Sequence, residues 1–325
     1  MNLAELTIAP SRLSSFEDPW RGPLALIALD REQVAPDGLR LPACPAIGIG
    51  DSAHPIAPRL DAVIEPPCGL ESLARNVLSH PRAAAAFVDV LRVTAPLEME
   101  EALTVESMAY AMLQGSAEHA GWRAMQNVEP QPSGRVHVER CGERLDVTLD
   151  RPAAGNAIDR QMRDALAEAL ALASLVPSLT QVRLLATGKA FSLGADLAEF
   201  GTTTDPASAH AIRHLTLPAR AAIECADRLE AHVDGACVGA GLELAAFSSR
   251  VTATSRSWFQ LPELAMGIIP GAGGCVSLPR RIGRQRTALM VLSGRRISAS
   301  QALAWGLVDA IVDDIASDDG RSNVL

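Results

Sequence analysis

Two glutamates, Glu243 and Glu263, lie twenty residues apart, and each is next to a glycine-rich turn. The first belongs to the segment VGAGLELA, which begins at Val238, and the second precedes GIIPGAGG, which begins at Gly267. Two carboxylates that face one cavity can hold a water molecule and exchange protons with it and with a carbon acid. Tight turns can direct backbone N–H groups at an oxyanion. The pattern therefore predicts acid–base chemistry beside an oxyanion-binding turn.

The segments around these glutamates alternate between strand and helix patterns. A β-hairpin is expected over residues 136–149, followed by a helix for which Asp159 is the N-cap. Further helices are expected to end near Arg228 and to begin at Leu242. Strands are expected at 182–186, 231–233 and 251–254. Repeated strand–strand–helix units of this kind predict a layered α/β fold.

Residues 126–134 contain two prolines, a serine and a glycine, and they are the best candidate for a linker. The segment before it has the pattern of a small α/β region. Strands are expected at 23–29, 46–49 and 60–64, and helical stretches at 71–93, interrupted at Pro81, and at 105–125. The predicted organisation is an N-terminal region over 1–130, a catalytic region over 131–312 and a disordered, acidic tail over 313–325.

Composition narrows the class of protein. The chain has 325 residues, 48% of them hydrophobic, and a formal net charge of −9, which does not favour binding to nucleic acid or to an anionic membrane surface. No export signal or membrane-length apolar run is seen, so we expect a cytoplasmic protein. The six cysteines are scattered without a Cys-x-x-Cys pair, so we expect reduced thiols and no metal site.

Five motifs, in order, resemble those of the crotonase (enoyl-CoA hydratase/isomerase) superfamily. They are Arg151-Pro with Asn156-Ala, GKAFSLGADL from Gly188, Asp234-Gly with VGAGLELA, Leu261-Pro-Glu with GIIPGAGG, and the segment from Ser293 to Val308. One motif alone would be weak, whereas the ordered set is specific. The resemblance covers residues 135–312 and implies a spiral of β-β-α units, a coenzyme A thioester ligand with no other cofactor, and usually a trimer or a dimer of trimers.

The resemblance also implies how the thioester would be held. Its carbonyl oxygen would accept hydrogen bonds from the peptide N–H groups of Ala195 and Ala240. As the α-carbon gains carbanion character, negative charge moves onto this oxygen, and fixed donors stabilise it. The family more often has glycine at the position of Ala240.

By the same resemblance, Glu243 and Glu263 match the two carboxylates that hydratases use. Glu243 would orient and deprotonate a water that attacks Cβ of a 2-enoyl thioester, and Glu263 would exchange the proton at Cα. Two carboxylates this close should share a proton, which raises one apparent pKa. The presence of both favours hydration over double-bond isomerisation. The alternatives are another acyl-CoA reaction (isomerisation, thioester hydrolysis, decarboxylation or oxygenation) or a non-catalytic acyl-CoA-binding subunit.

The loop over residues 188–198 matches the stretch that binds the adenine and pantetheine parts of coenzyme A. The candidate substrate-binding residues are Lys189, Ala190, Asp196, Leu197 and Ala198, with Gly239 and Gly241 from the second turn. Asp196 is more typical of a helix N-cap than of an acid. Six arginines between 280 and 296 could clamp phosphates or form a solvated face, and we favour the solvated face for most of them.

The chain departs from the family pattern at both ends. Crotonases usually continue past the segment at Val308 for several helices, which cover the active site and build the trimer. Here that helical region is short, and an extra N-terminal region is present instead. We hypothesise that helices over residues 103–125 cover the site or interface that the missing helices would cover.

Overall fold

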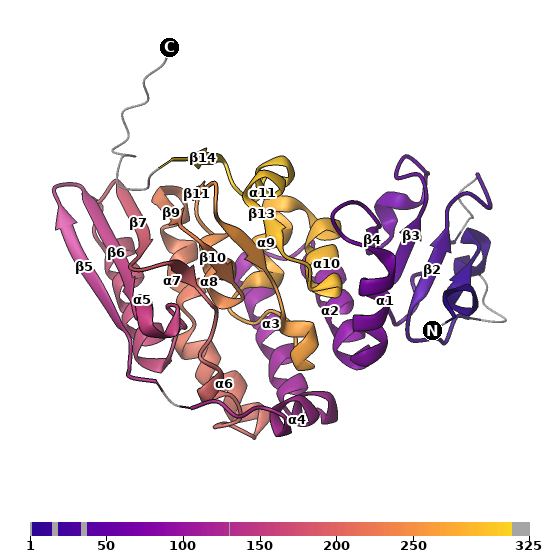
Figure 1. The fold of residues 1–325 in the computed structure, drawn as a ribbon, viewed down its shortest axis with the longest axis horizontal. Helices are drawn as coiled ribbons and strands as arrows, with labels where there is room; N and C mark the ends of the chain where they lie inside the picture. The colour runs from indigo at the N-terminus through magenta and orange to yellow at the C-terminus, as the bar shows by residue number, and fades with distance from the viewer. Residues whose placement is uncertain (1, 15–18, 34–37, 130, 314–325) are drawn as a thin grey trace, which may run out of the picture.

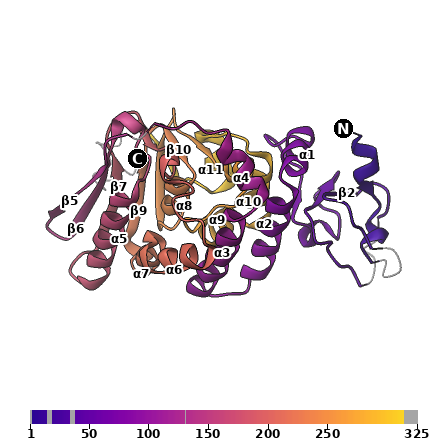
Figure 2. The ribbon, with the colours of Figure 1, turned by 90° about the horizontal axis from the view of Figure 1, so that it is seen from below.

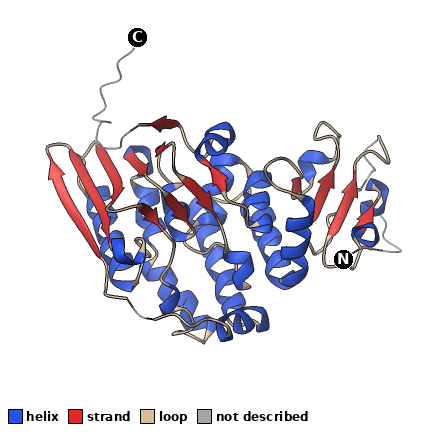
Figure 3. Cartoon of the chain, viewed as in Figure 1, coloured by secondary structure: helices blue, strands red, loops and turns tan. Residues whose placement is uncertain are grey.

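The computed structural model describes residues 2–14, 19–33, 38–129 and 131–313. Apart from Asp313, the predicted tail lies outside the described residues. The described chain forms three sheets with helices packed on and between them (Figure 1, Figure 3). No helix in this part of the chain is both long and apolar enough to cross a membrane.

The hairpin predicted after the linker is present. Its strands are β5 (Arg135–Cys141) and β6 (Arg144–Asp150), which pair antiparallel. Along β6, buried residues alternate with half-buried ones, because successive side chains of a strand point to opposite faces of the sheet. The hairpin forms one edge of the largest sheet, whose strand order is β14-β11-β9-β7-β6-β5.

After the hairpin, successive pairs of strands divide between two sheets. The first strand of each pair joins the largest sheet, and the second joins a smaller sheet of order β13-β12-β10-β8. The pairs are β7 (Gln181–Ala186) with β8 (Ala190–Ser192), β9 (Leu229–Val233) with β10 (Ala236–Val238), and β11 (Arg250–Thr254) with β12 (Trp258–Gln260). These strands pair in parallel within each sheet, and β13 (Ile297–Ser298) and β14 (Ala310–Val312) complete the two sheets. The chain therefore winds as the expected spiral of β-β-α units.

Helices connect the strand pairs of the spiral. They are α5 (Arg160–Leu175), α6 (Pro206–Thr216), α7 (Pro218–Glu224), α8 (Ala240–Ala245), α9 (Gly274–Ile282), α10 (Arg284–Ser293) and α11 (Ala299–Trp305). The Asp159 carboxylate accepts a hydrogen bond from the backbone N–H of Met162, which confirms its predicted role as the N-cap of α5. Helix α8 begins at Ala240, two residues before the predicted start at Leu242.

The N-terminal region contains a parallel sheet and four helices. The strands β1 (Thr7–Ile8), β2 (Ala25–Ala28), β3 (Ala46–Ile49) and β4 (Ala62–Val63) lie in sequence order. The helices are α1 (Leu70–Ser79), α2 (Pro81–Thr94), α3 (Met99–Gln114) and α4 (Ala117–Ala124). The single helical stretch expected over 105–125 is wrong in detail. It breaks at Gly115, and Ser116 then caps α4 by accepting a hydrogen bond from the N–H of His119.

The hydrophobic core is continuous across the predicted boundary at residue 130. Phe87 of α2 and Leu103 of α3 belong to the same buried cluster as Leu170 of α5 and Val276 of α9. Helices α2 and α3 both contact α9, and α1 contacts α10. Figures 1 and 2 show these N-terminal helices against the spiral, while the sheet of β1 to β4 lies at the far end of the molecule.

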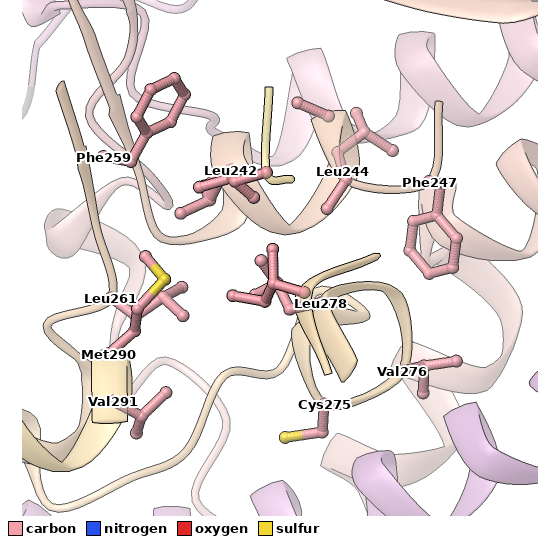
Figure 4. Close-up of a cluster of buried hydrophobic side chains, with 14 of the residues drawn as sticks. Leu242, Leu244, Phe247, Phe259, Leu261, Cys275, Val276, Leu278, Met290 and Val291 are labelled. Atoms are coloured by element: carbon pink, nitrogen blue, oxygen red, sulfur yellow. The ribbon is translucent and has the colours of Figure 1, made fainter. Parts of the chain in front are cut away.

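Buried leucines hold the short helix α8 in place. Figure 4 shows Leu242 and Leu244 of this helix in the cluster that includes Leu278 of α9 and Phe259 of β12. Burying each leucine side chain stabilises the fold by about 1.5–3 kcal/mol. Since Glu243 lies between these two leucines in the sequence, their packing fixes the backbone of Glu243 and hence the direction of its side chain.

Candidate active site

A cavity of about 200 Å³ opens between the spiral and α3. Its wall includes all four residues that the sequence predicts to be catalytic, namely Ala195, Ala240, Glu243 and Glu263. Tyr110 of α3 also lines it. The structure therefore gathers into one cavity residues that come from three successive β-β-α units and from the N-terminal region.

The turns that carry Ala195 and Ala240 are in direct contact. Gly194 has φ +97°, and a Cβ at this position would lie 3.2 Å from the carbonyl oxygen of Val238 and 3.6 Å from the amide nitrogen of Ala240. Only glycine adopts this conformation without strain and allows so close an approach. The N–H groups of Ala195 and Ala240 have no acceptor among the described residues. Two unpaired donors thus lie on the wall of the cavity.

Glu243 is buried on α8 and is held by the next glycine-rich turn. Its Oε2 accepts hydrogen bonds from the backbone N–H of Ala272 at 2.6 Å and of Gly274 at 2.8 Å. Burial raises the pKa of Glu243 to about 7, while these amides and the charge of Arg213 lower it. A carboxyl group with this pKa has the property that a general base needs at neutral pH.

Glu263 begins the short 3-10 helix η7 (Glu263–Met266), and its environment differs from that of Glu243. Its Oε2 is buried and has no hydrogen-bond partner among the described residues. Burial, and then the charge of Glu243, raise the pKa of Glu263 well above its usual range. A backbone hydrogen bond at Glu263 itself lowers this pKa but does not outweigh burial. A buried carboxyl group with an unpaired oxygen is stabilised in its protonated form, so this geometry favours Glu263 as the carrier of the shared proton.

Gly239 gives Glu263 the space that it occupies. The glycine has φ +48°, and a Cβ there would lie 2.7 Å from Oε1 of Glu263. Any side chain at this position would be strained and would displace the carboxyl group. The turn before α8 therefore both presents the N–H of Ala240 and leaves room for the second acid.

Three functional candidates from outside the motifs also surround the cavity. Tyr110 of α3 and Arg213 of α6 line it, and the guanidinium of Arg213 lies 4.1 Å from the centre of the Tyr110 ring. Glu106, one turn before Tyr110, is fully buried behind the wall. The sequence held one signal for Glu106, which is a glutamate on the buried face that also carries Leu103 and Tyr110.

The predicted coenzyme A residues divide between the cavity and its surroundings. Leu197 and Gly239 line the cavity, and Asp196 lines an adjoining hollow. Asp196 also caps the short helix η5 (Leu197–Glu199) through the N–H of Ala198, as the sequence predicts, and it accepts a hydrogen bond from Nη1 of Arg151 at 2.7 Å.

The remaining members of this set lie elsewhere. Lys189 is exposed and does not line the cavity, whereas Gly241 is buried against Ser192. The carbonyl oxygen of Ala190 accepts a hydrogen bond from the side chain of Asn156. Arg160 and Arg163 of α5 also line the cavity, and no motif in the sequence marks these two cations.

Four of the six clustered arginines bind other parts of the chain. The prediction of a solvated face is wrong for the half-buried Arg281, Arg284 and Arg286, whereas Arg280 is exposed as predicted. Arg281 donates to the carbonyl oxygens of Leu307 and Ser248, and Arg280 donates to that of Leu97. Arg284 and Arg286 pair with Asp61 and Glu65 of the N-terminal region. Their carboxylate and carbonyl partners are distant in sequence, so a run of arginines alone could not reveal them.

Comparison with known proteins agrees with this geometry. The sequence profile described as enoyl-CoA hydratase/isomerase matches residues 144–318. Mevalonyl-coenzyme A hydratase of Beauveria bassiana is 35% identical over 178 residues, which cover 52% of this chain and 64% of that protein. The 2,3-dehydroadipyl-CoA hydratase of Escherichia coli is 36% identical over 174 residues, which cover 54% of this chain and 68% of that protein. The chain thus spans about two thirds of the length of these relatives.

Solved structures show the same relationship in three dimensions. An enoyl-CoA hydratase from Thermoplasma volcanium aligns with a TM-score of 0.50 at 36% identity, over 56% of this chain and 73% of that one. An enoyl-CoA hydratase/isomerase from Mycobacterium abscessus aligns with a TM-score of 0.51 at 35% identity, over 56% and 71%. The profile covers more than half of the 325-residue chain, and the β-β-α spiral agrees with it. The chain belongs to the enoyl-CoA hydratase/isomerase family.

Proposed function

We propose that this protein is an enoyl-CoA hydratase, which adds water across the double bond of a 2-enoyl-CoA thioester. One observation carries the proposal. Two unpaired backbone N–H groups, of Ala195 and Ala240, line the same cavity as two buried carboxyl groups whose pKa values are raised. Relatives named as hydratases and dehydratases of CoA thioesters support the assignment.

The four groups account for each bond change in this reaction. Ionised Glu243 takes a proton from water as the water oxygen bonds to Cβ, and the π electrons move through Cα onto the thioester oxygen. The N–H groups of Ala195 and Ala240 stabilise that oxygen while it carries negative charge. Protonated Glu263 then delivers a proton to Cα, which yields the 3-hydroxyacyl thioester. The dehydration of a 3-hydroxyacyl thioester would use the same groups in reverse.

The coenzyme A part would run along the loop of residues 188–198 toward α5. Arg160 and Arg163, in the first turn of α5, line the cavity and are suited to its phosphates. Lys189 lies outside the lining but on the same loop, where it could meet a more distant phosphate. As in the family, a trimer or a dimer of trimers is the proposed assembly.

A crotonyl-CoA hydration assay with three variants tests the function. Glu243→Gln and Glu263→Gln each remove one proton carrier with little change in shape, so each should lower kcat by about 10²–10⁴-fold. Glu224→Gln is the matched control, because Glu224 is an exposed residue at the end of α7. Wild-type protein that binds crotonyl-CoA without hydrating it would refute the proposal. Hydration that survives both active-site substitutions would refute the roles of the glutamates.

A further inference from the structure

Four consecutive backbone amides, those of residues 272–275, are divided between two buried carboxylates. Glu243 takes the N–H of Ala272 and of Gly274, at 2.6 and 2.8 Å. Glu106 takes the two that alternate with them, Gly273 and Cys275, at 2.8 Å each. The same short turn therefore lies between the predicted base and a carboxylate that comes from helix α3, far earlier in the chain.

We propose that Glu106 is a positioning residue for Glu243: it holds the turn of residues 270–275 in the shape that presents two amides to Glu243. The proposal rests on the role of Glu243 in the proposed function. Glu106 does not line the cavity, so it would act through the turn rather than by touching the substrate.

The geometry of Glu106 favours this role over simple packing. Its Oε1 accepts from Gly273 and its Oε2 from Cys275, so the residue uses both carboxylate oxygens. An amide side chain has only one oxygen and would place its own NH₂ against the second backbone N–H. If the position served packing alone, an apolar residue would suit it better, because a buried carboxylate near other carboxylates is electrostatically unfavourable.

Several titratable or charged groups face Glu243. They are Glu106 and Tyr110 of α3, Glu263 of η7, Cys275 of α9 and the cation Arg213 of α6. Burial, and then the charge of Glu243, raise the pKa of Glu106 to about 8, while Arg213 and the two amides lower it. Because the pKa of Glu243 is the lower of the two, at about 7, the charge of Glu106 does not set it. Glu106 acts instead through the turn, whose amides of Ala272 and Gly274 lower the pKa of Glu243.

Substitution of Glu106 tests this role. Glu106→Gln replaces one of the two acceptors with an NH₂ group, so kcat/KM should fall about 10- to 100-fold. The acidic limb of its pH profile, where Glu243 ionises, should also move to higher pH, because a disturbed turn withdraws amides that lower the pKa of Glu243. Glu106→Asp keeps two carboxylate oxygens at a shorter reach, so it should lie between wild type and Glu106→Gln in both measurements.

The matched control is Glu101→Gln, which removes a charge from the same helix at an exposed position. It should change neither kcat/KM nor the profile. A Glu106→Gln protein that loses activity with both limbs unmoved would overturn the positioning role, because a merely structural loss lowers the profile without shifting it. If Glu106→Gln does not fold, a soluble Glu106→Asp protein with wild-type kcat/KM would overturn the positioning role.

A substrate-free measurement distinguishes this inference from the proposed function. An infrared pH titration of unliganded protein follows the protonated carboxyl band, and the band that disappears in Glu243→Gln identifies Glu243. This band should titrate at higher pH in Glu106→Gln than in wild type. A shift in a protein that hydrates no enoyl-CoA would refute the proposed reaction alone. An unshifted band in a protein that does hydrate crotonyl-CoA would refute the positioning role of Glu106 alone.

Discussion

The glycine-rich turns of residues 188–274 line the cavity together with α3, while α4 packs against η7, and the turns and the helices contribute to the site in different ways. The turns contribute backbone N–H groups, which need particular φ values and close approach, as at Gly194 and Gly239. The helices contribute side chains from ordinary helical backbone, such as Tyr110. Where backbone N–H groups form a site, glycines are needed at particular positions, and these can be recognised in the sequence. A helix that supplies a side chain needs no special residue nearby, so the sequence gives almost no local signal for it.

The two helices support the two predicted acids separately. Glu106 of α3 binds the turn that holds Glu243. In α4, Nδ1 of His119 donates to the carbonyl oxygen of Met266, 2.8 Å away, at the end of the 3-10 helix that Glu263 begins. The N-terminal region thus contacts the segments that carry or hold both predicted acids, although it carries none of the motifs.

Removal of the N-terminal helices should have the largest effect, because it takes away everything that this region contributes to the site. A chain beginning at Ser133 would expose the faces of α9 and α10 that α1, α2 and α3 cover, and it would lose Glu106 and Tyr110. We expect this chain to aggregate or to show no hydration of crotonyl-CoA. Size-exclusion chromatography and the activity assay measure both outcomes.

The control for this truncation keeps every contact and breaks only the chain. A protease site inserted between residues 126 and 134 allows full-length protein to be cut after folding, and the two pieces should stay together and active. A soluble, fully active chain from Ser133 onward would instead show that the spiral needs no cover from α3 and α4.

A second prediction tests the contribution of a backbone N–H group, that of Ala240, which is the first residue of α8. Proline is tolerated at the first position of a helix and lacks an N–H, so Ala240→Pro removes one donor of the predicted oxyanion hole. We expect kcat/KM for crotonyl-CoA to fall by about 10²–10³-fold. Ala240→Gly keeps the N–H and should remain close to wild type. Equal activity of these two variants would exclude this amide as a donor, provided that circular dichroism shows both to be folded.

The parts of the fold that the sequence revealed are those with a local physical signature. The strand at 46–49 and the hairpin around Gly142 agree with their patterns, and Asp159 caps its helix as expected. The strands β8, β10 and β12 were not predicted. Each has three residues next to a turn, and its strand character comes from pairing with neighbours far away in sequence.

The candidate site divides in the same way. Ala195 and Ala240 could be named in advance because the resemblance to the family implies peptide donors at these positions, and the flanking glycines fit a close approach of backbone to a ligand. Glu106 could not, because its partners, the amides of Gly273 and Cys275, are defined only by how α3 packs on α9. A glutamate on an otherwise apolar helical face shows that something compensates its charge, but it does not show what.

The smallest expected effect is on the stability of the fold, and it concerns Glu263, whose Oε2 has no hydrogen-bond partner among the described residues. The folded state keeps Glu263 protonated well above the pH at which the unfolded chain releases that proton, since burial raises its pKa. Between the unfolded and the folded pKa, the unfolded state therefore binds fewer protons, and stability falls by about 1.4 kcal/mol per pH unit. Glu263→Gln removes this dependence. Its melting temperature relative to wild type should rise as the pH increases from 5 to 8, while activity is lost.

The change with pH is the decisive measurement, because a glutamine amide buried without partners has a cost that is the same at every pH. Thermal melts of wild type, Glu263→Gln and the exposed control Glu224→Gln at several pH values separate the pH-dependent effect of the Glu263 proton from the constant cost of the buried amide. The control should follow wild type throughout. If the difference between Glu263→Gln and wild type stays constant from pH 5 to 8, Glu263 is ionised in the folded protein at neutral pH. The proton would then have to reach Cα from another group, and the division of roles between the two glutamates would be reversed.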